Sequence, residues 1–277
     1  MDIGVLGALS VTENGASVTP TAPKPRQVLA LLAVRAGQVV PVSALTEELW
    51  GDRPPRSART TLQTYVLQLR ELIASALGQE SGEDARAVAK DVLVTEPGGY
   101  LLNTLGGTSD AAEFERLAGL GYRAMDAGDH ADGARRLHEA LALWRGPVFA
   151  DVRCGAQLQT EARRLEEIRL CALDRRIDAD LRLGRHRELL GEMSVLVSHY
   201  RTHESLHGQF MLALHRSGRR SEALQVYQRL RTTLSRELGL EPSAALRRIQ
   251  RSILMPAPDT IRPGAERGDE QHLTRVG

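Results

Sequence analysis

The sequence is poor in the residue types on which several classes of site and scaffold depend. Its 277 residues include two cysteines, Cys154 and Cys171, which are too few and too far apart for a zinc knuckle or a disulfide scaffold. Aromatic residues make up 4% of the chain, so a cage of rings around a ligand is not expected. There is no run of eighteen apolar residues, and the amino terminus MDIGVLGALS lacks the basic and apolar regions of a signal peptide. These absences favour a reduced, cytoplasmic protein with no membrane partner.

The signatures of common enzymes are also missing, with one exception. Neither G-x-x-x-x-G-K-[ST] nor G-x-S-x-G occurs, which excludes a P-loop and a nucleophile elbow. Residues 203–207 read H-E-x-x-H, a spacing that places two imidazoles on one helix face for zinc. No third ligand follows at a familiar spacing, and so short a match arises easily in a chain with eight histidines. We expect no enzyme, no metal and no cofactor, and we expect both cysteines to be small buried hydrophobic residues. Zinc analysis of the purified protein decides the alternative.

Charge is unevenly distributed along a chain that is nearly neutral overall. The chain has 36 basic and 35 acidic residues, and 42% of its residues are hydrophobic, enough for one large core or two ordinary ones. Residues 24–70 contain seven basic and three acidic residues, a net charge of +4, whereas residues 71–96 carry −4. A local positive patch of this size neutralises a few phosphates, which implies moderate, salt-sensitive affinity for nucleic acid and a second copy or partner.

Residues 57–78 lie in and just after this positive stretch and read as a helix with two unlike faces. Leu62, Val66, Leu69 and Ile73 recur at steps of three and four residues, a stripe that is expected to face a core. The opposite side carries short polar side chains, flanked by arginines. They suit contact with base edges and phosphates, although an ordinary amphipathic surface helix has a similar pattern.

The elements before this helix are predicted by turn and helix signals. Residues 1–20 form short apolar pieces separated by Asn14-Gly15, a hairpin signal, which predicts a small antiparallel sheet. Residues 23–36 and residues 42–50 read as helices, with an extended piece at residues 39–41 between them.

The elements after this helix complete a compact motif. Residues 79–89 are acidic and are expected to form a mobile connector. Residues 92–102 read as strand, Pro-Gly-Gly turn and strand, which is a β-hairpin. A winged helix-turn-helix is a compact motif that combines a small sheet, three helices and a hairpin. In this motif the third helix lies in the major groove of DNA.

Three segments, KPRQVLALLA, VSALTEELWGDRPPRSARTTLQTYVLQLR and the Gly-Tyr-Leu-Leu end of the hairpin, closely resemble the winged-helix domain of the Streptomyces antibiotic regulatory proteins. The resemblance spans residues 1–103. It implies base-edge contacts by the third helix, phosphate contacts by basic residues around it, and contact of the preceding loop with RNA polymerase and its sigma factor. The residues so placed at base edges are Thr60, Gln63, Thr64, Tyr65 and Gln68. The phosphate candidates are Lys24, Arg26, Arg56, Arg59 and Arg70. The polymerase candidates are Gly51, Asp52, Arg53, Pro54 and Pro55. The wing departs from the family at Glu96, where a basic residue is common.

The second half of the chain reads as helical throughout. A small polar linker at residues 104–109 precedes residues 110–255, where glycine corners at Gly128, Gly184 and Gly218 separate helices. The last two corners are 34 residues apart, the period of tetratricopeptide-like helical hairpins. ALALWRGPVFADV and ELGLEPSAALRRIQ, with the segments between them, resemble the bacterial transcriptional activation domain, which implies a role in dimer formation and polymerase contact. Residues 256–277 are rich in proline and charge and are expected to be a disordered tail.

We therefore expect a mainly α protein with a small β part, a winged helix followed by an all-α domain. The expected function is that of a sequence-specific transcriptional activator. It binds direct repeats of promoter DNA near the −35 region as a side-by-side pair and recruits RNA polymerase at the nucleoid. The resemblance implies control of an antibiotic or other secondary-metabolite gene cluster. A repressor or architectural DNA binder, and a pure protein-interaction scaffold, are the alternatives.

Overall fold

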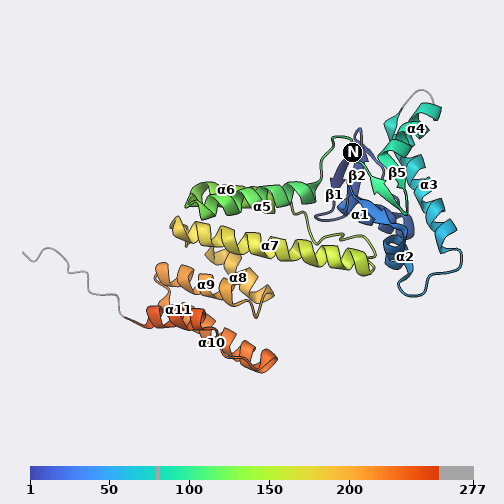
Figure 1. The fold of residues 1–277 in the computed structure, drawn as a ribbon. Helices are drawn as coiled ribbons and strands as arrows, with labels where there is room; N and C mark the ends of the chain where they lie inside the picture. The colour runs from blue at the N-terminus through green and yellow to red at the C-terminus, as the bar shows by residue number, and fades with distance from the viewer. Residues whose placement is uncertain (79–81, 256–277) are drawn as a thin grey trace, which may run out of the picture. The chain divides into compact units, whose positions relative to one another are not determined.

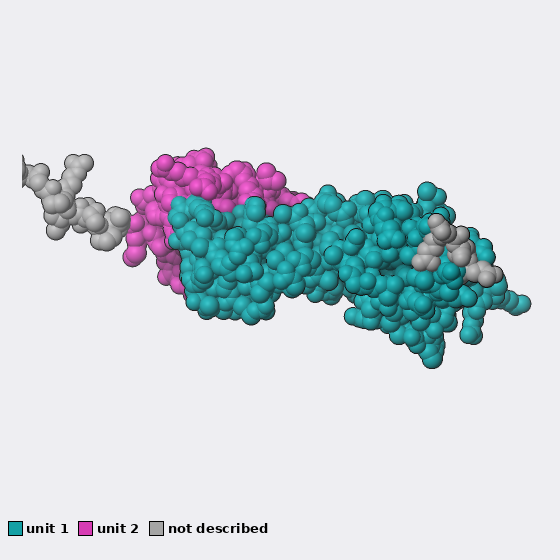
Figure 2. All heavy atoms as spheres, turned by 90° about the horizontal axis from the view of Figure 1, so that it is seen from above, with its two compact units in different colours: residues 1–185 teal, residues 186–277 magenta. Residues whose placement is uncertain are grey.

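The computed structural model describes residues 1–78 and 82–255, and the chain divides into two compact units. The first unit comprises Met1–Arg185 and the second His186–Gly277, coloured teal and magenta in Figure 2. The domain limits expected from the sequence, residues 1–103 and 110–255, do not coincide with the limits of these two compact units. The first unit contains the whole winged helix together with the first three helices that follow it.

The chain begins with a small antiparallel sheet, as the hairpin signal predicts. Its strands are β1 (Asp2–Gly4), β2 (Ser10–Glu13) and β3 (Ala16–Ser17), in the order β1-β2-β3. Asn14 and Gly15 have φ angles of 49° and 79°, the left-handed values that a two-residue hairpin turn requires. The small sheet predicted for the amino terminus is confirmed.

Three helices follow, with one short strand between the first two (Figure 1). These are α1 (Pro23–Val34), β4 (Val39–Pro41), α2 (Val42–Trp50) and α3 (Ala58–Leu77). Proline begins α1, where its missing N–H costs nothing. Gly78 ends α3 in the left-handed conformation, with φ of 60°. The boundaries expected from the sequence agree with these to within about two residues.

The wing is a second three-stranded sheet. β5 (Leu93–Glu96) and β6 (Gly99–Leu102) pair antiparallel, and β6 also pairs with β4, so that the order is β4-β6-β5. Tyr100 lies opposite Thr95 on one side and Val40 on the other. The central strand β6 therefore joins the β5–β6 hairpin of the wing to β4, which lies between α1 and α2.

The sequence predicts a mobile connector between α3 and the wing, and this prediction is wrong for most of the segment. A helix, α4 (Gly82–Val92), occupies it and packs against α3. Ala85, Ala89 and Val92 are buried at steps of four and three residues, and the charged residues Arg86, Lys90 and Asp91 interrupt this short pattern in the sequence. Residues 79–81, also part of that expectation, lie outside the described residues.

The first unit continues with three long helices that run side by side in Figure 1: α5 (Asp110–Asp126), α6 (His130–Ala142) and α7 (Ala156–Arg182). Gly121 and Gly133 let α5 and α6 approach closely. A Cβ on Gly121 would lie 2.6 Å from Leu137 Cγ, and one on Gly133 would lie 2.8 Å from Met125 Cγ.

The segment expected to be a linker is attached to the amino terminus. The amino group of Met1 donates to Thr104 O at 3.0 Å, and Ile3 N donates to Thr108 O at 2.8 Å. Ile3 also forms a parallel bridge with Ser109. The start of α5 therefore lies beside β1.

The second unit is entirely helical over its described residues. It contains α8 (Leu190–His199), α9 (Glu204–Arg216), α10 (Arg220–Leu238) and α11 (Ala244–Leu254), and α9 contacts the other three.

The predicted glycine corners are confirmed, because Gly128, Gly184 and Gly218 have φ angles of 82°, 80° and 82° at helix ends. The tail expected at residues 256–277 lies outside the described residues.

One expectation about the cysteines is wrong. Cys154 is half-buried and burial raises the pKa of its thiol, but Cys171 is exposed on α7.

Among residues 1–78 and 82–255, none of the helices combines the length and the apolar character that a membrane span needs.

Candidate nucleic-acid interface

The two faces predicted for α3 are both present. Leu62, Val66, Leu69 and Ile73 are each 1% exposed and form one continuous stripe in the core. Burying four such side chains stabilises the docked helix by about 1.5–3 kcal/mol each. Thr60, Gln63, Thr64 and Gln68 are exposed on the other side. The core contacts therefore hold the backbone of α3, while this polar face, Thr60, Gln63, Thr64 and Gln68, is free of intramolecular packing.

The start of α3 presents positive charge to solvent. Arg56 and Arg59 are exposed, and neither forms an ion pair within the part of the chain that the structure describes. Ser57 occupies the N-cap position, but its side chain accepts no capping hydrogen bond. The first amides of the helix and the two guanidinium groups together form a positive end that suits a phosphate.

The loop before α3 is exposed over its whole length. Its five residues predicted to contact polymerase are Gly51, Asp52, Arg53, Pro54 and Pro55. Gly51 turns the chain after α2 with φ of 61°, and the two prolines restrict the backbone that follows. The loop is therefore both accessible and conformationally limited.

Two of the basic residues predicted to contact phosphates are engaged within the chain. Lys24 Nζ donates to Leu49 O and lies 5.7 Å from the centre of the Trp50 ring. Arg26 forms an ion pair with Asp151, which is 125 residues away in the sequence. Both side chains are half-buried. A phosphate would have to compete with these partners.

Arg70 is a third basic residue with an internal role. Its Nε and Nη2 donate to Leu93 O at 3.0 and 2.7 Å, and Nη2 also donates to Thr95 Oγ1 at 2.8 Å. Burial lowers the pKa of Arg70, and the neighbouring Tyr100 opposes that shift. Arg70 thus joins the middle of α3 to the first strand of the wing.

The remaining predicted residues lie at the edge of this surface. Tyr65 is half-buried and packs against the core from α3. Glu96 is half-buried at the end of β5, beside the wing turn. A carboxylate at that place repels the phosphates of DNA.

Two residues on the exposed side of α3 were missed in the sequence. Leu67 is 57% exposed, and Glu71 is exposed one turn later. Leu67 follows Val66 by one residue, which is about 100° around an α-helix, so helical periodicity places it outside the buried stripe. Glu71 carries a charge that disfavours close approach of DNA phosphates. The part of α3 suited to DNA is therefore its first half, from Ala58 to Gln68.

The winged helix is joined to the long helices by a buried carboxylate. Glu48 in α2 is 3% exposed and accepts hydrogen bonds from Gln27 Nε2 at 2.8 Å, Gly155 N at 2.5 Å and Leu158 N at 2.9 Å. Gly155 and Leu158 belong to the first turn of α7, whose free amides and dipole favour an anion. A carboxylate from the winged helix therefore caps a helix of the region that follows.

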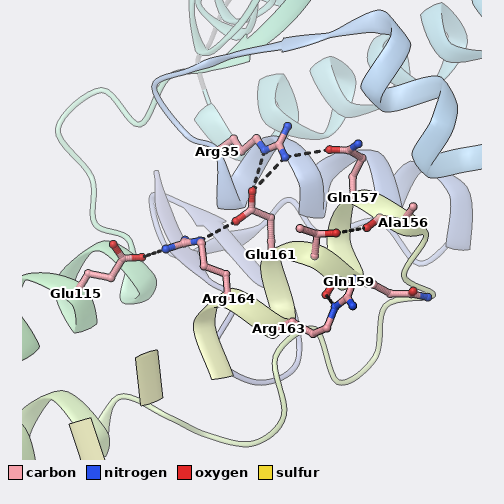
Figure 3. A network of polar contacts seen from close by, with 9 residues as sticks. Arg35, Glu115, Ala156, Gln157, Gln159, Glu161, Arg163 and Arg164 are labelled. Carbon is pink, nitrogen blue, oxygen red and sulfur yellow. Dashed lines mark hydrogen bonds and ion pairs between the residues drawn. The ribbon is translucent and has the colours of Figure 1, made fainter. Parts of the chain in front are cut away.

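A network of charged side chains extends this junction (Figure 3). Arg35, which follows α1, donates to Glu161 at 3.1 Å and to Gln157 at 3.0 Å. Glu161 also accepts from Arg164, whose Nη1 donates to Glu115 of α5 at 2.8 Å. The network thus links the winged helix to α7 and α7 to α5.

Two aspartates fasten the segment between β1 and β2 to the start of α5 and to the segment between α6 and α7. Asp110, at the start of α5, accepts from Val5 N at 2.8 Å and from Leu6 N at 3.0 Å. Asp151 accepts from Leu9 N at 2.8 Å. These contacts explain why Met1–Arg185 forms a single compact unit.

The H-E-x-x-H segment has a structural role. His203 is the N-cap of α9, and its Nδ1 accepts from Leu206 N at 3.3 Å. His207 is 6% exposed, its Nδ1 lies 3.0 Å from His203 O, and burial lowers its pKa. Glu204 accepts from Ser243 N. No group of three or more metal-binding side chains occurs in residues 1–78 and 82–255.

Comparisons with known proteins agree with this architecture. Residues 16–85 match the model of the C-terminal domain of transcriptional regulatory proteins, and residues 109–254 match that of the bacterial transcriptional activator domain. The chain is 51% identical to the regulatory protein DnrI of Streptomyces peucetius, over 96% of both chains. It is 36% identical to AfsR of Streptomyces coelicolor, over 92% of this chain but 24% of AfsR. The structure of Mycobacterium tuberculosis EmbR in complex with a low affinity phosphopeptide aligns with a TM-score of 0.82 at 34% identity, over 93% of this chain and 66% of that one.

A winged helix followed by an activator-type helical domain defines a transcriptional regulator, and the chain is a regulator rather than an enzyme. It belongs to the family of Streptomyces antibiotic regulatory proteins, in the short two-domain form to which its match with DnrI assigns it.

Proposed function

We propose that this regulator binds promoter DNA in a sequence-specific way and activates transcription. The observation that carries the proposal is the polar face of α3. It is exposed, it is backed by a buried stripe of four apolar residues, and it begins beside two arginines without ion-pair partners in the described chain. A rigid helix with amide and hydroxyl side chains suits the donor and acceptor pattern of the major groove.

In this proposal the residues of the surface divide into two groups by what they are free to contact. Thr60, Gln63, Thr64 and Gln68 contact base edges, with Tyr65 at their margin. Arg56 and Arg59 contact phosphates. Lys24, Arg26 and Arg70 act on DNA binding mainly through the helices and the wing that they hold, because their donors already have partners.

The free positive charge is small, which favours binding as a pair. Two exposed arginines and one helix end neutralise few phosphates, so one copy binds weakly at physiological salt. Two copies side by side on direct repeats would combine their affinities. Repeats that face the same side of the duplex recur at about 10–10.5 bp. The expected site overlaps the −35 region of a promoter.

Activation requires contact with the transcription machinery, and the loop of Gly51, Asp52, Arg53, Pro54 and Pro55 suits that contact. It is exposed and restricted by two prolines, and it immediately precedes the helix proposed to lie on DNA. RNA polymerase and its sigma factor are the proposed partners, with the helical region as a second contact. The proposed setting is the nucleoid in the cytoplasm, at an antibiotic or secondary-metabolite gene cluster.

The test combines binding and transcription with the same purified protein. Footprinting on promoters around its gene should show protection that repeats at one helical turn and weakens as salt rises. Transcription in vitro should increase when the protein is added. Asp52→Ala and Arg53→Ala should lower that increase without changing the footprint. A decrease in transcription on adding the protein would identify a repressor, and salt-independent or absent DNA binding would identify a protein-interaction scaffold.

A further inference from the structure

One apolar side chain interrupts the polar face of α3. Leu67 is 57% exposed, whereas the four apolar residues of the buried stripe are each 1% exposed. It follows Gln63 by four residues and Thr64 by three, so it lies beside both on the same side of the helix. Its side chain therefore belongs to the surface proposed to enter the major groove.

Exposure alone does not give Leu67 a role, since single exposed leucines are common on protein surfaces. Its position is the informative observation. The neighbours on its side of the helix are Gln63, Thr64, Gln68 and Glu71, all exposed and all polar. Among the described residues, those that pack against the core do not include Leu67, so no such contact requires an apolar side chain there.

We propose that Leu67 reads thymine by contact with its C5-methyl group, an inference that rests on the proposed function of α3. In the major groove the thymine methyl is the apolar feature of the base-pair edges, and the other features are hydrogen-bond donors and acceptors. Leucine has neither a donor nor an acceptor. Pressed against an adenine or guanine edge, it would deprive polar atoms of water without replacing their hydrogen bonds.

The geometry of the helix places this thymine relative to the base contacted by Gln63. Four residues of an α-helix advance about 6 Å, since each residue rises about 1.5 Å. Successive base pairs are about 3.4 Å apart along a strand. With α3 along the groove, the thymine lies within about two base pairs of the base that Gln63 contacts. Leu67 thus adds a thymine to each repeat of the operator.

The experiment removes one methyl group at a time. The probe is a duplex selected from a randomised pool by the purified protein, in which each thymine of one repeat is replaced in turn by deoxyuridine. Uracil keeps the hydrogen-bonding edge and lacks only the methyl. The wild type should lose affinity about fourfold at one or two positions, the factor that corresponds to one buried methyl-sized group.

The decisive measurement is the same scan with Leu67→Ala. This variant should bind the thymine duplex about as weakly as the wild type binds the uracil duplex, and it should show no further loss at those positions. Alanine favours helix, so the fold is retained. Val195→Ala serves as the control. Val195 is 70% exposed on α8, and this variant should still lose about fourfold at the same positions.

The two levels of the proposal fail in different ways. A wild type that selects a sequence but loses nothing at any uracil, or a Leu67→Ala variant that still loses fourfold there, overturns the role of Leu67 alone. Selection of no sequence from the pool, with equal binding to all duplexes, overturns the proposed function and the thymine contact with it.

Discussion

The carboxylate of Glu48 accepts a hydrogen bond from the backbone N–H of Leu158 at 2.9 Å, although 110 residues separate the two in the sequence. Both atoms are buried, and the same carboxylate also holds Gly155 N and Gln27 Nε2. The relationship ties α2 of the winged helix to the first turn of α7. The same contacts fix α2, the helix that precedes the proposed polymerase loop, against α7.

Replacing Glu48 with glutamine should destabilise the first unit. The amide keeps one acceptor oxygen but turns an NH₂ group toward the free amides of α7, which leaves buried donors without acceptors. We expect a loss of about 1–3 kcal/mol in the free energy of unfolding. Denaturant unfolding followed by circular dichroism measures it. Glu47→Gln is the matched control, because Glu47 is exposed and should change stability by no more than about 0.5 kcal/mol. Equal effects of the two variants would contradict the capping role.

Gln63→Ala should relax sequence choice as well as weaken binding. A side chain that makes a bidentate contact with one base contributes about 1–3 kcal/mol of discrimination against the wrong bases. Removing it should lower affinity for the cognate duplex and leave affinity for random DNA unchanged. Competition binding with both duplexes gives the ratio. Gln225→Ala, a change to an exposed glutamine on α10, should leave the ratio as it is.

Arg59→Ala should weaken cognate and random duplexes by the same factor, because a phosphate contact carries no sequence information. The slope of log affinity against log salt should become shallower by about 0.9, as one fewer counterion is released. Titrations at several salt concentrations measure the slope. Arg187→Ala, at an exposed arginine of the second unit, is the control. An unchanged slope in Arg59→Ala would place that side chain away from the DNA backbone.

Arg70→Ala should act on stability rather than on the salt slope. The variant removes donors to Leu93 O and Thr95 Oγ1 and leaves a half-buried carbonyl oxygen poorly satisfied. We expect a loss of about 1–3 kcal/mol in the free energy of unfolding. Hydrogen exchange should increase first in β5. The result that contradicts this role is a shallower salt slope with unchanged stability.

The second unit should lose stability in mild acid through His207. Burial lowers the folded-state pKa of His207. The contact with the backbone oxygen of His203 and the charge of Glu204 oppose that shift, and the charges of His203 and Arg229 add to it. The unfolded chain therefore binds more protons than the folded one, and stability falls as the pH drops below the unfolded value of about 6.5. Thermal unfolding between about pH 7.5 and pH 5.5 should show less acid dependence in His207→Leu than in the wild type. The exposed His138, changed to glutamine, should retain the wild-type dependence.

Much of the winged helix was predictable because its signals are local. The hairpin at Asn14-Gly15, the proline that begins α1 and the stripe on α3 each depend on residues within one or two turns of one another. The family resemblance placed the same elements, and the comparisons bear it out. The connector after α3 was mispredicted because composition suggested a loop, whereas Ala85, Ala89 and Val92 form a buried stripe too small to dominate the pattern.

The candidate site was predictable only in part. The polar side chains of α3 follow from helical periodicity, and their exposure agrees with it. Whether a basic side chain is free or already paired within the chain does not follow from the sequence, because the sign of its charge does not identify its partner. Lys24, Arg26 and Arg70 have the same local appearance as Arg56 and Arg59, but Leu49, Asp151 and Leu93, with which they pair, lie 25, 125 and 23 residues away.

By itself, the sequence determined the order of the elements of the winged helix other than α4, the face of α3 that is buried and the family to which the chain belongs. These depend on short-range periodicity, turn chemistry and the residue identities themselves. Only the tertiary structure decided which cations remain free for DNA, and that the winged helix shares a compact unit with α5, α6 and α7. It also showed Leu67 exposed among polar residues on α3. The reason is that burial, ion pairing and capping arise between segments that meet only in the folded chain.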